Sequence, residues 1–137
     1  MIVLAIALGA AVGAPLRFVV ERRLASDYPR GTLAVNVVGS AILGGLVGWM
    51  VHHSGTPSAA TLLALVGTGF CGALTTFGGF AAQVLDLAVA PARPAGTGLA
   101  ASPGPAVRRA AGYAVLSVVL CLGMAAAAEV AVRSLVG

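Results

Sequence analysis

The residues of this chain that could do chemistry are few, and they lie inside hydrophobic segments. The first candidate is the backbone of 67–80, which has five glycines and stands inside a hydrophobic run over 59–90. As one straight helix those 32 residues would span about 48 Å, whereas the hydrocarbon core of a bilayer is about 30 Å thick. Because glycine weakens a helix interior, we predict a break here. Backbone groups freed in a membrane are tolerated only where they are buried in protein, line a cavity or bind an ion.

The second candidate is the side chain of Asn36, inside the hydrophobic segment 32–51. A carboxamide in hydrocarbon is unfavourable unless it is hydrogen-bonded. Two interpretations stay open: the amide joins neighbouring helices, or its N–H donors line a polar pathway. Asn36 recurs with Ser40, Gly44 and Gly48 at intervals of four residues, which puts all of them on one helical face and predicts that another helix approaches closely there.

Composition identifies an integral membrane protein. Of 137 residues, 59% are hydrophobic and 9% are charged, and the mean hydropathy is +1.02, whereas soluble domains carry about 25% charged residues. The pI near 10.1 does not indicate a nucleic-acid partner, because the arginines flank hydrophobic segments and leave no basic soluble surface. Cys71 and Cys121 are expected to be free thiols, and no nucleophile–base or metal-ligand spacing predicts an enzyme.

We expect an all-α membrane protein that forms a single transmembrane domain over 1–137, surrounded by lipid. Each crossing is a hydrophobic run between polar or turn residues, and the third is predicted to be broken near 72–77. The four runs cover 2–20, 32–51, 59–90 and 110–132. The stretch 91–109 holds four of the seven prolines and is predicted to be a flexible linker.

The arginines predict one orientation. With four crossings, the loops 21–31 and 91–109 share a side that carries, together with Arg17, seven arginines, and the other side carries Arg133 alone. Basic loops favour the cytoplasm, so we expect a multi-pass protein of the inner or plasma membrane with both termini outside. Arg17 itself has two interpretations: its side chain reaches the lipid headgroups, or its charge concentrates anions in a vestibule.

Three segments together resemble the CrcB/Fluc fluoride channel family. GAPLRF at 13–18 resembles the motif G-x-x-x-R-[YF], and GTLAVNVVGS at 31–40 is similar to G-T-x-x-V-N-x-x-G-S. GFCGALTTF at 69–77, followed by Phe80, resembles G-F-x-G-x-x-T-T-F-x-x-F. The resemblance implies a four-helix subunit, an antiparallel dimer and a structural Na⁺ at the dimer centre. It also implies two pores through which cytoplasmic fluoride leaves the cell passively, so that its toxicity to the cell is reduced.

The resemblance also implies roles for individual residues. The main-chain carbonyls of Gly72 and Thr75 would bind the Na⁺, which is not itself transported. Fluoride binds its water tightly, so its path must offer other donors. The ring edges of Phe77 and Phe80 carry positive potential and can face an anion. The expected fluoride pathway comprises Asn36, Phe77, Phe80, Tyr113 and Ser117, with Arg17 at the vestibule.

One departure from the family pattern concerns the segment that follows the threonines. The family usually continues T-T-F-S-T-F-S, whereas this chain has Gly78, Gly79 and Ala81 in place of the hydroxyl residues. A pore lined by this segment is therefore predicted to be impaired. The strong arginine bias also disfavours insertion in both orientations, so we hypothesise a dimer with a related subunit of opposite orientation. The alternative is a poorly conducting accessory subunit of such a channel.

A small multidrug transporter is the rival from another class. That chemistry needs a carboxylate in the middle of the membrane. All four acidic residues are instead expected in loops or near helix ends, namely Glu21, Asp27, Asp86 and Glu129.

Overall fold

The chain was analysed as a computed structural model that describes residues 1–53, 55–89 and 104–136. Within these residues all regular structure is helical, and four helices are long and apolar enough to cross a membrane. They are α1 (Ile2–Arg23), α2 (Arg30–His53), a third crossing over Pro57–Val89, and α6 (Gly104–Val136). Hydropathy alone therefore predicted the all-α class and the four crossings, and both are confirmed.

The third crossing is built from four pieces, α3 (Pro57–Leu62), the π-helix η1 (Leu63–Cys71), α4 (Gly72–Leu74) and α5 (Phe77–Val89). Helical structure stops at Thr75, whose backbone is extended (φ −83°, ψ 158°), and resumes at Phe77. The break therefore falls within the predicted interval 72–77, but at two threonines rather than at a glycine. The glycines before it remain helical, so their number was the wrong reason for a correct prediction.

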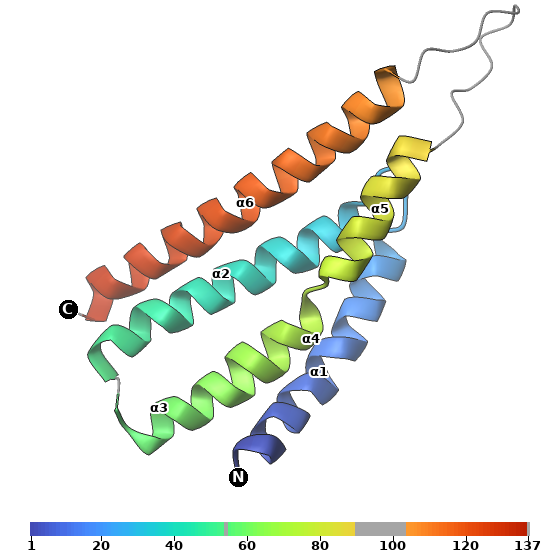
Figure 1. The fold of residues 1–137 in the computed structure, drawn as a ribbon. Coiled ribbons are helices and arrows are strands. Elements are labelled where there is room, and N and C mark those ends of the chain that lie inside the picture. The colour runs from blue at the N-terminus through green and yellow to red at the C-terminus, as the bar shows by residue number, and fades with distance from the viewer. Residues whose placement is uncertain (54, 90–103, 137) are drawn as a thin grey trace, which may run out of the picture.

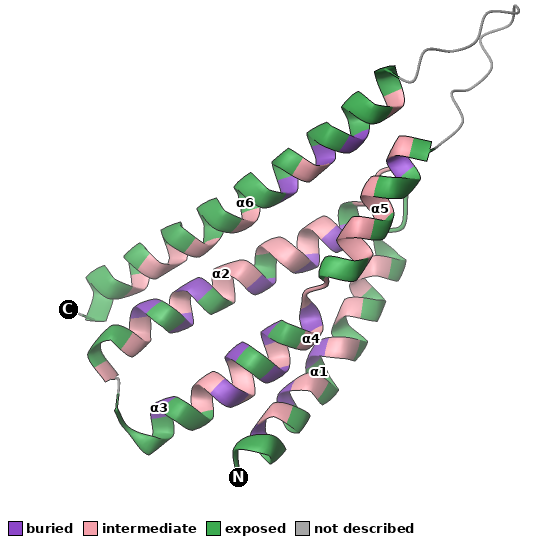
Figure 2. Cartoon of the chain, in the orientation of Figure 1, coloured by how far each residue is buried: buried purple, intermediate pink, exposed green. Residues whose placement is uncertain are grey.

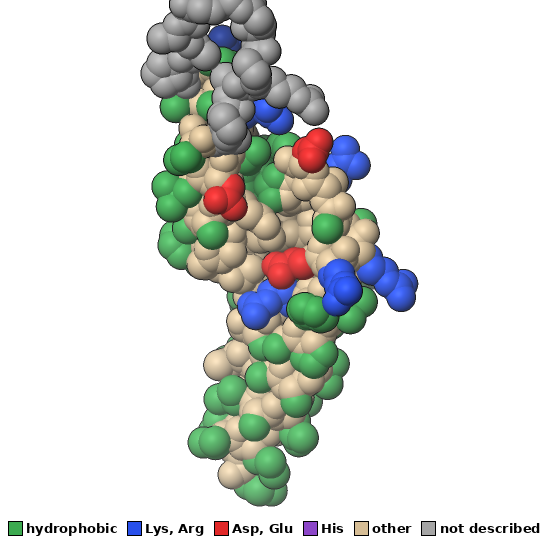
Figure 3. Space-filling view, turned by 90° about the vertical axis from the view of Figure 1, so that its right-hand side faces the viewer, with side chains coloured by type: hydrophobic (Ala, Val, Ile, Leu, Met, Phe, Trp, Pro, Cys, Tyr) green, Lys and Arg blue, Asp and Glu red, His purple; other side chains and the backbone are tan. Residues whose placement is uncertain are grey.

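The crossings alternate in direction, so the α1–α2 turn and the end of α5 lie at one end of the bundle and both ends of the chain lie at the other (Figure 1). On the face shown in Figure 3, the charged side chains gather over one part of the molecule, and the remainder is covered by hydrophobic and uncharged side chains. A charged end beside an uncharged stem is the pattern of a helix bundle that leaves the bilayer at that end.

Three helices extend beyond the predicted hydrophobic runs, and one of them, α2, covers Arg30–His53 rather than 32–51. α1 continues to Arg23, and α6 begins at Gly104, so the residues 104–109 that we assigned to a flexible linker are helical. Pro105 does not prevent this, because proline is tolerated in the first turn, where its missing N–H has no partner to lose. The rest of that linker, with Arg93, lies outside the described residues.

Glycines hold the helices together by allowing backbones to touch. On α2, a Cβ at Gly44 would collide with the backbone of Ala125 on α6, and one at Gly48 would meet Glu129. On α1, a Cβ at Gly9 would collide with the carbonyl of Leu65 in η1. The predicted close approach at the α2 stripe is confirmed for its glycines, and their partner is α6.

Burial is low on the outer surfaces, as lipid requires. Figure 2 shows that α6 is exposed along most of its length, with its few buried residues on the side toward the other helices. Ala110, Tyr113 and Ser117 are these buried residues. Together with Leu87 of α5, Ala110 and Tyr113 form a small hydrophobic core at the charged end of the bundle.

The α2–α6 contact yields a first prediction. Gly44→Ala should lower the free energy of unfolding by about 1–3 kcal/mol, because the added methyl forces the two backbones apart. Gly45→Ala is the matched control: its Cβ would make an ordinary 3.5 Å contact with Val132, so it should be neutral or stabilise by up to ~1 kcal/mol through helix propensity. Thermal unfolding in detergent, followed by the single tryptophan, Trp49, measures both. Equal effects of the two variants would contradict it.

Candidate functional site

The break in the third crossing is held by the side chain of Asn36. Its Oδ1 accepts the backbone N–H of Thr76 at 2.8 Å, and its Nδ2 donates to the carbonyl of the same residue at 3.2 Å. One carboxamide thus bonds both backbone groups of Thr76: the N–H has lost its helical acceptor, whereas the carbonyl also accepts the N–H of Phe80 at 3.4 Å. The first interpretation of Asn36, a link between helices, is what these contacts show. Its place in a polar pathway stays a prediction.

The neighbouring residue, Thr75, is held from α1 and from within its own crossing. Its carbonyl accepts a bond from Nη1 of Arg17 at 3.4 Å, and its N–H and hydroxyl both donate to the carbonyl of Cys71 at 2.9 Å. Arg17 therefore makes a contact that neither sequence-based interpretation included, and its place at a vestibule stays a prediction. Thr76 Oγ1 then accepts the N–H of Gly79 at 3.0 Å and caps the start of α5.

This arrangement leaves backbone carbonyls available for a cation. In an uninterrupted helix the Thr76 N–H would donate to the carbonyl of Gly72, but here it donates to Asn36. The Gly72 carbonyl is released in this way, and both Gly72 and Thr75 line one open cleft. Carbonyl oxygens are the hard donors that a hard cation prefers. The residues predicted to hold Na⁺ therefore fit such an ion, although the Thr75 carbonyl is already shared with Arg17.

The cleft beside the break has a volume of about 420 Å³ and opens between α2, the broken crossing and α6. It is lined largely by apolar groups, with a few polar ones among them. Of the predicted fluoride-pathway residues, the cleft brings together Asn36, Phe77, Phe80 and Ser117. The rings of Phe77 and Phe80 lie 5.9 Å apart between centroids, and Phe77 is 81% exposed, so its ring has no packing partner that fixes it in a core.

Ser117 is a polar residue of the cleft whose hydroxyl lacks a hydrogen-bond partner among the described residues. Its side chain is only 3% exposed, and its Oγ has no hydrogen-bond partner within the described part of the chain. A buried hydroxyl without a partner costs about 1–3 kcal/mol, so native structures seldom keep one without a function. Tyr113, the other predicted pathway residue of α6, is 1% exposed and packs on Phe80, with ring centroids 5.9 Å apart. It does not line the cleft.

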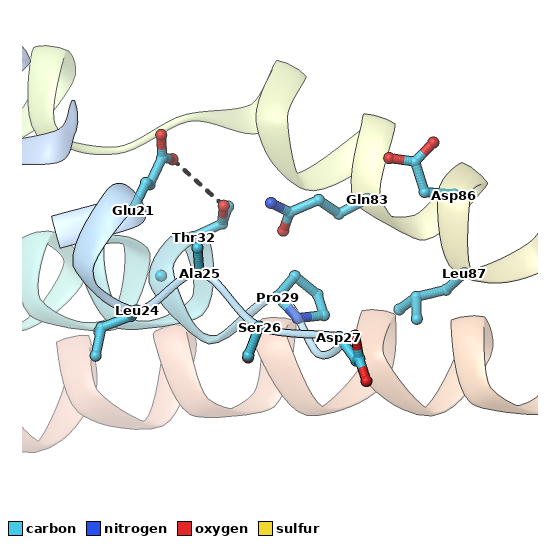
Figure 4. A pocket seen from close by; sticks show the side chains of 11 residues that line it. Glu21, Leu24, Ala25, Ser26, Asp27, Pro29, Thr32, Gln83, Asp86 and Leu87 are labelled. Carbon is cyan, nitrogen blue, oxygen red and sulfur yellow. Dashed lines mark hydrogen bonds between the residues drawn. The ribbon is translucent and has the colours of Figure 1, made fainter. Parts of the chain in front are cut away.

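A second cavity, of about 350 Å³, lies between the α1–α2 turn and α5 (Figure 4). Glu21, Asp27 and Asp86 contribute carboxylates to its lining, and Thr32 donates to Glu21 at 3.3 Å. Negative charge disfavours an anion here. The first cleft is therefore the better candidate for an anion path.

Sequence reasoning missed Gln83, which reaches from α5 toward Thr32 in this second cavity (Figure 4). Its Oε1 accepts a bond from the hydroxyl of Tyr113 at 3.1 Å. The available signal was its type, since it is the single carboxamide of the segment 59–90, but its partner is 30 residues away.

Comparison with known proteins identifies a family and several relatives. The family profile described as "CrcB-like protein, Camphor Resistance (CrcB)" matches residues 4–129. The chain is 46% identical over 84 residues to Fluoride-specific ion channel FluC 1 of Nocardia farcinica. The aligned residues cover 58% of this chain and 54% of that protein. It is 43% identical to Fluoride-specific ion channel FluC of Pseudomonas aeruginosa and 47% identical to that of Chromobacterium violaceum, each over 62% of this chain and 68% of the relative. The chain thus spans about half the length of the first of these relatives.

The contacts of Asn36 yield a second prediction. Asn36→Leu, of similar volume, leaves the N–H of Thr76 unpaired, whereas the Thr76 carbonyl keeps its bond from the N–H of Phe80 at 3.4 Å. The variant should lower the free energy of unfolding by roughly 1–3 kcal/mol. The Thr76 amide should also exchange with deuterium faster, because its acceptor is gone. Ser40→Ala is the control, since Ser40 lines the same cleft one turn away. Unchanged exchange at Thr76 in Asn36→Leu would show that the break is held in another way.

Proposed function

The chain belongs to the CrcB-like protein family, and on this premise we propose that it is a subunit of a fluoride-specific ion channel. The observation that carries the proposal is the cleft beside the break, where the unpartnered hydroxyl of Ser117 shares one apolar space with Phe77 and Phe80. The names of the relatives support the choice of ion. Relatives named as channels also favour a channel over an enzyme or a multidrug transporter.

The chemistry of the cleft suits a small, strongly hydrated anion. Ser117 Oγ–H is a free donor, and the amide of Asn36 has a second hydrogen beyond the one that it gives to Thr76. The positive edges of the phenylalanine rings can replace further water without adding a charge that would trap the ion. An apolar wall keeps water out and strengthens each of these contacts.

The direction of transport follows from the membrane potential. We propose that the arginine-rich loops face the cytoplasm and that both ends of the chain lie outside. In such a membrane, negative inside, an anion is driven outward by about 2.3 kcal/mol per 100 mV. No coupled ion or energy source is needed to remove cytoplasmic fluoride, and passive efflux would reduce its toxicity.

A partner subunit completes the proposal. The cleft that Gly72 and Thr75 line is open on the surface of the single subunit, where lipid would leave the Gly72 carbonyl without a partner. A second subunit packed antiparallel would cover them, and its own two carbonyls would complete a structural Na⁺ site at the dimer centre. Because the arginine bias commits this chain to one orientation, that partner is a related subunit of opposite bias.

A second candidate is a poorly conducting accessory subunit within the same channel. A specific observation favours it: a Cβ added at Gly78 would meet nothing within 4 Å, so the position where the family pattern carries a hydroxyl residue is open space. The pore next to this α5 would then conduct less than the pore lined by the partner.

Fluoride efflux from liposomes tests the proposed function. The chain reconstituted alone should release little fluoride, whereas co-reconstitution with a related subunit of opposite bias should restore efflux selective over chloride. In that pair, Ser117→Ala in this chain should reduce efflux through the pore that Ser117 lines at least about tenfold, since one lost hydrogen bond to a charged species is worth roughly 1.5–3 kcal/mol. Total efflux should then fall to that of the other pore. Ser134→Ala, at the exposed end of α6, is the matched control.

The outcomes separate the parts of the proposal. Absence of fluoride efflux from every pairing would refute the channel assignment. Robust efflux from this chain alone, together with insertion in both orientations by cysteine accessibility, would refute only the requirement for a partner of opposite bias.

The glycines of α5 yield a further prediction. Gly78→Ser places a hydroxyl in open space and should increase efflux several-fold in the reconstituted pair, since each added donor lowers the cost of dehydrating the ion. Gly79→Ser should not, because its Cβ would lie 2.8 Å from Cγ2 of Thr76 and disturb the residue that caps α5. Both are measured by the initial rate of fluoride release. Equal rates in the two variants would contradict the proposal that a hydroxyl at position 78 adds a donor to the fluoride path.

A further inference from the structure

We propose that Arg17 competes with the sodium ion for the carbonyl of Thr75. Its guanidinium binds this carbonyl when sodium does not, and it lowers the affinity of the site for sodium. The inference rests on the sodium site proposed above and adds a means of regulating it. Neither sequence-based interpretation of Arg17, at the headgroups or in a vestibule, includes this role.

The two candidate carbonyls differ in their present partners. The carbonyl of Gly72 lost its usual donor when the Thr76 N–H turned to Asn36, so it is available to a cation. The carbonyl of Thr75 already accepts from Arg17 Nη1 at 3.4 Å, a long bond that a better ligand could replace. A cation that uses both carbonyls must therefore share or displace Arg17.

The charge of Arg17 cannot be removed to make room. A guanidinium keeps its proton in proteins. Among the residues that the structure describes, the one ion pair joins Arg133 to Glu129, so no carboxylate neutralises Arg17. Two positive charges that share one carbonyl at the centre of a membrane protein repel strongly, because the medium between them screens little.

Two measurable consequences follow. Without sodium, Arg17 keeps the break satisfied and the subunit folded. With sodium, Arg17 opposes the ion, so that the site fills only at higher concentration. Loss of the charge should thus make the protein depend more on sodium and also bind sodium more tightly, since a ligand that binds only the folded state stabilises it according to its affinity.

The experiment measures thermal stability of the assembled channel in detergent against sodium concentration, with N-methylglucamine as the replacing cation. Arg17→Gln should lower the sodium concentration at half-maximal stabilisation by about tenfold or more, a shift set by the lost repulsion, and should lose stability in the absence of sodium. Arg17→Lys keeps the charge and should behave as the unmodified chain does. Arg23→Gln removes one exposed charge from the same helix and should also leave the midpoint unchanged.

Each result decides between ideas. If sodium stabilises the unmodified channel but Arg17→Gln shows the same midpoint, the proposed competition between Arg17 and sodium is wrong, and the proposed sodium site is retained. If the unmodified channel does not respond to sodium, the site and the inference fall together, while fluoride efflux still tests the channel function by itself. If Arg23→Gln shifts the midpoint as much as Arg17→Gln does, the effect is one of overall charge, and the inference is overturned.

Discussion

The structure depends on one requirement: every backbone group freed at Thr75 and Thr76 must find a partner inside a membrane. Asn36 of α2 accepts the N–H of Thr76 and shares the Thr76 carbonyl with the N–H of Phe80, and Arg17 of α1 donates to the carbonyl of Thr75. Each of the three motif segments supplies one member of this small network. The break can therefore exist only where these three crossings meet, and its presence fixes their mutual positions. It also creates the released carbonyl of Gly72 and the cleft beside it.

Close packing provides the precision that this network needs. Hydrogen bonds of about 3 Å across helices require backbones that cannot drift. Contacts between bare glycines and neighbouring main chain, at Gly9 against η1 and at Gly44 against α6, fix the helices without side chains between them. In contrast, most of α6 remains exposed, so the subunit is tightly joined at its centre and open along one side.

Hydropathy and spacing predicted much of this arrangement, and the failures have physical causes. The four crossings followed from run length, and the glycine stripe on α2 followed from its four-residue spacing. The break lies in the expected interval for another reason than the one given, because the five glycines around it are in helical structure and the Thr76 N–H donates to Asn36 rather than to the carbonyl of Gly72. The partner of Arg17 and the bond between Tyr113 and Gln83 join residues 58 and 30 positions apart, and no local pattern contains such pairs. The helical start at 104–109 was missed because Pro105 was counted as a helix breaker, although the first turn of a helix accepts proline.

The position of both donors in the chain has a consequence for biosynthesis. Arg17 and Asn36 precede the break, so a chain made from its N-terminus has both side chains in place before Thr75 and Thr76 leave the ribosome. The interrupted third segment would be a poor membrane span if it were inserted first. The order of the segments thus lets the first two crossings receive the third and pair its backbone as it inserts. A circularly permuted chain that began with the third crossing would keep every contact of the folded state, but its third crossing would insert before these partners were present.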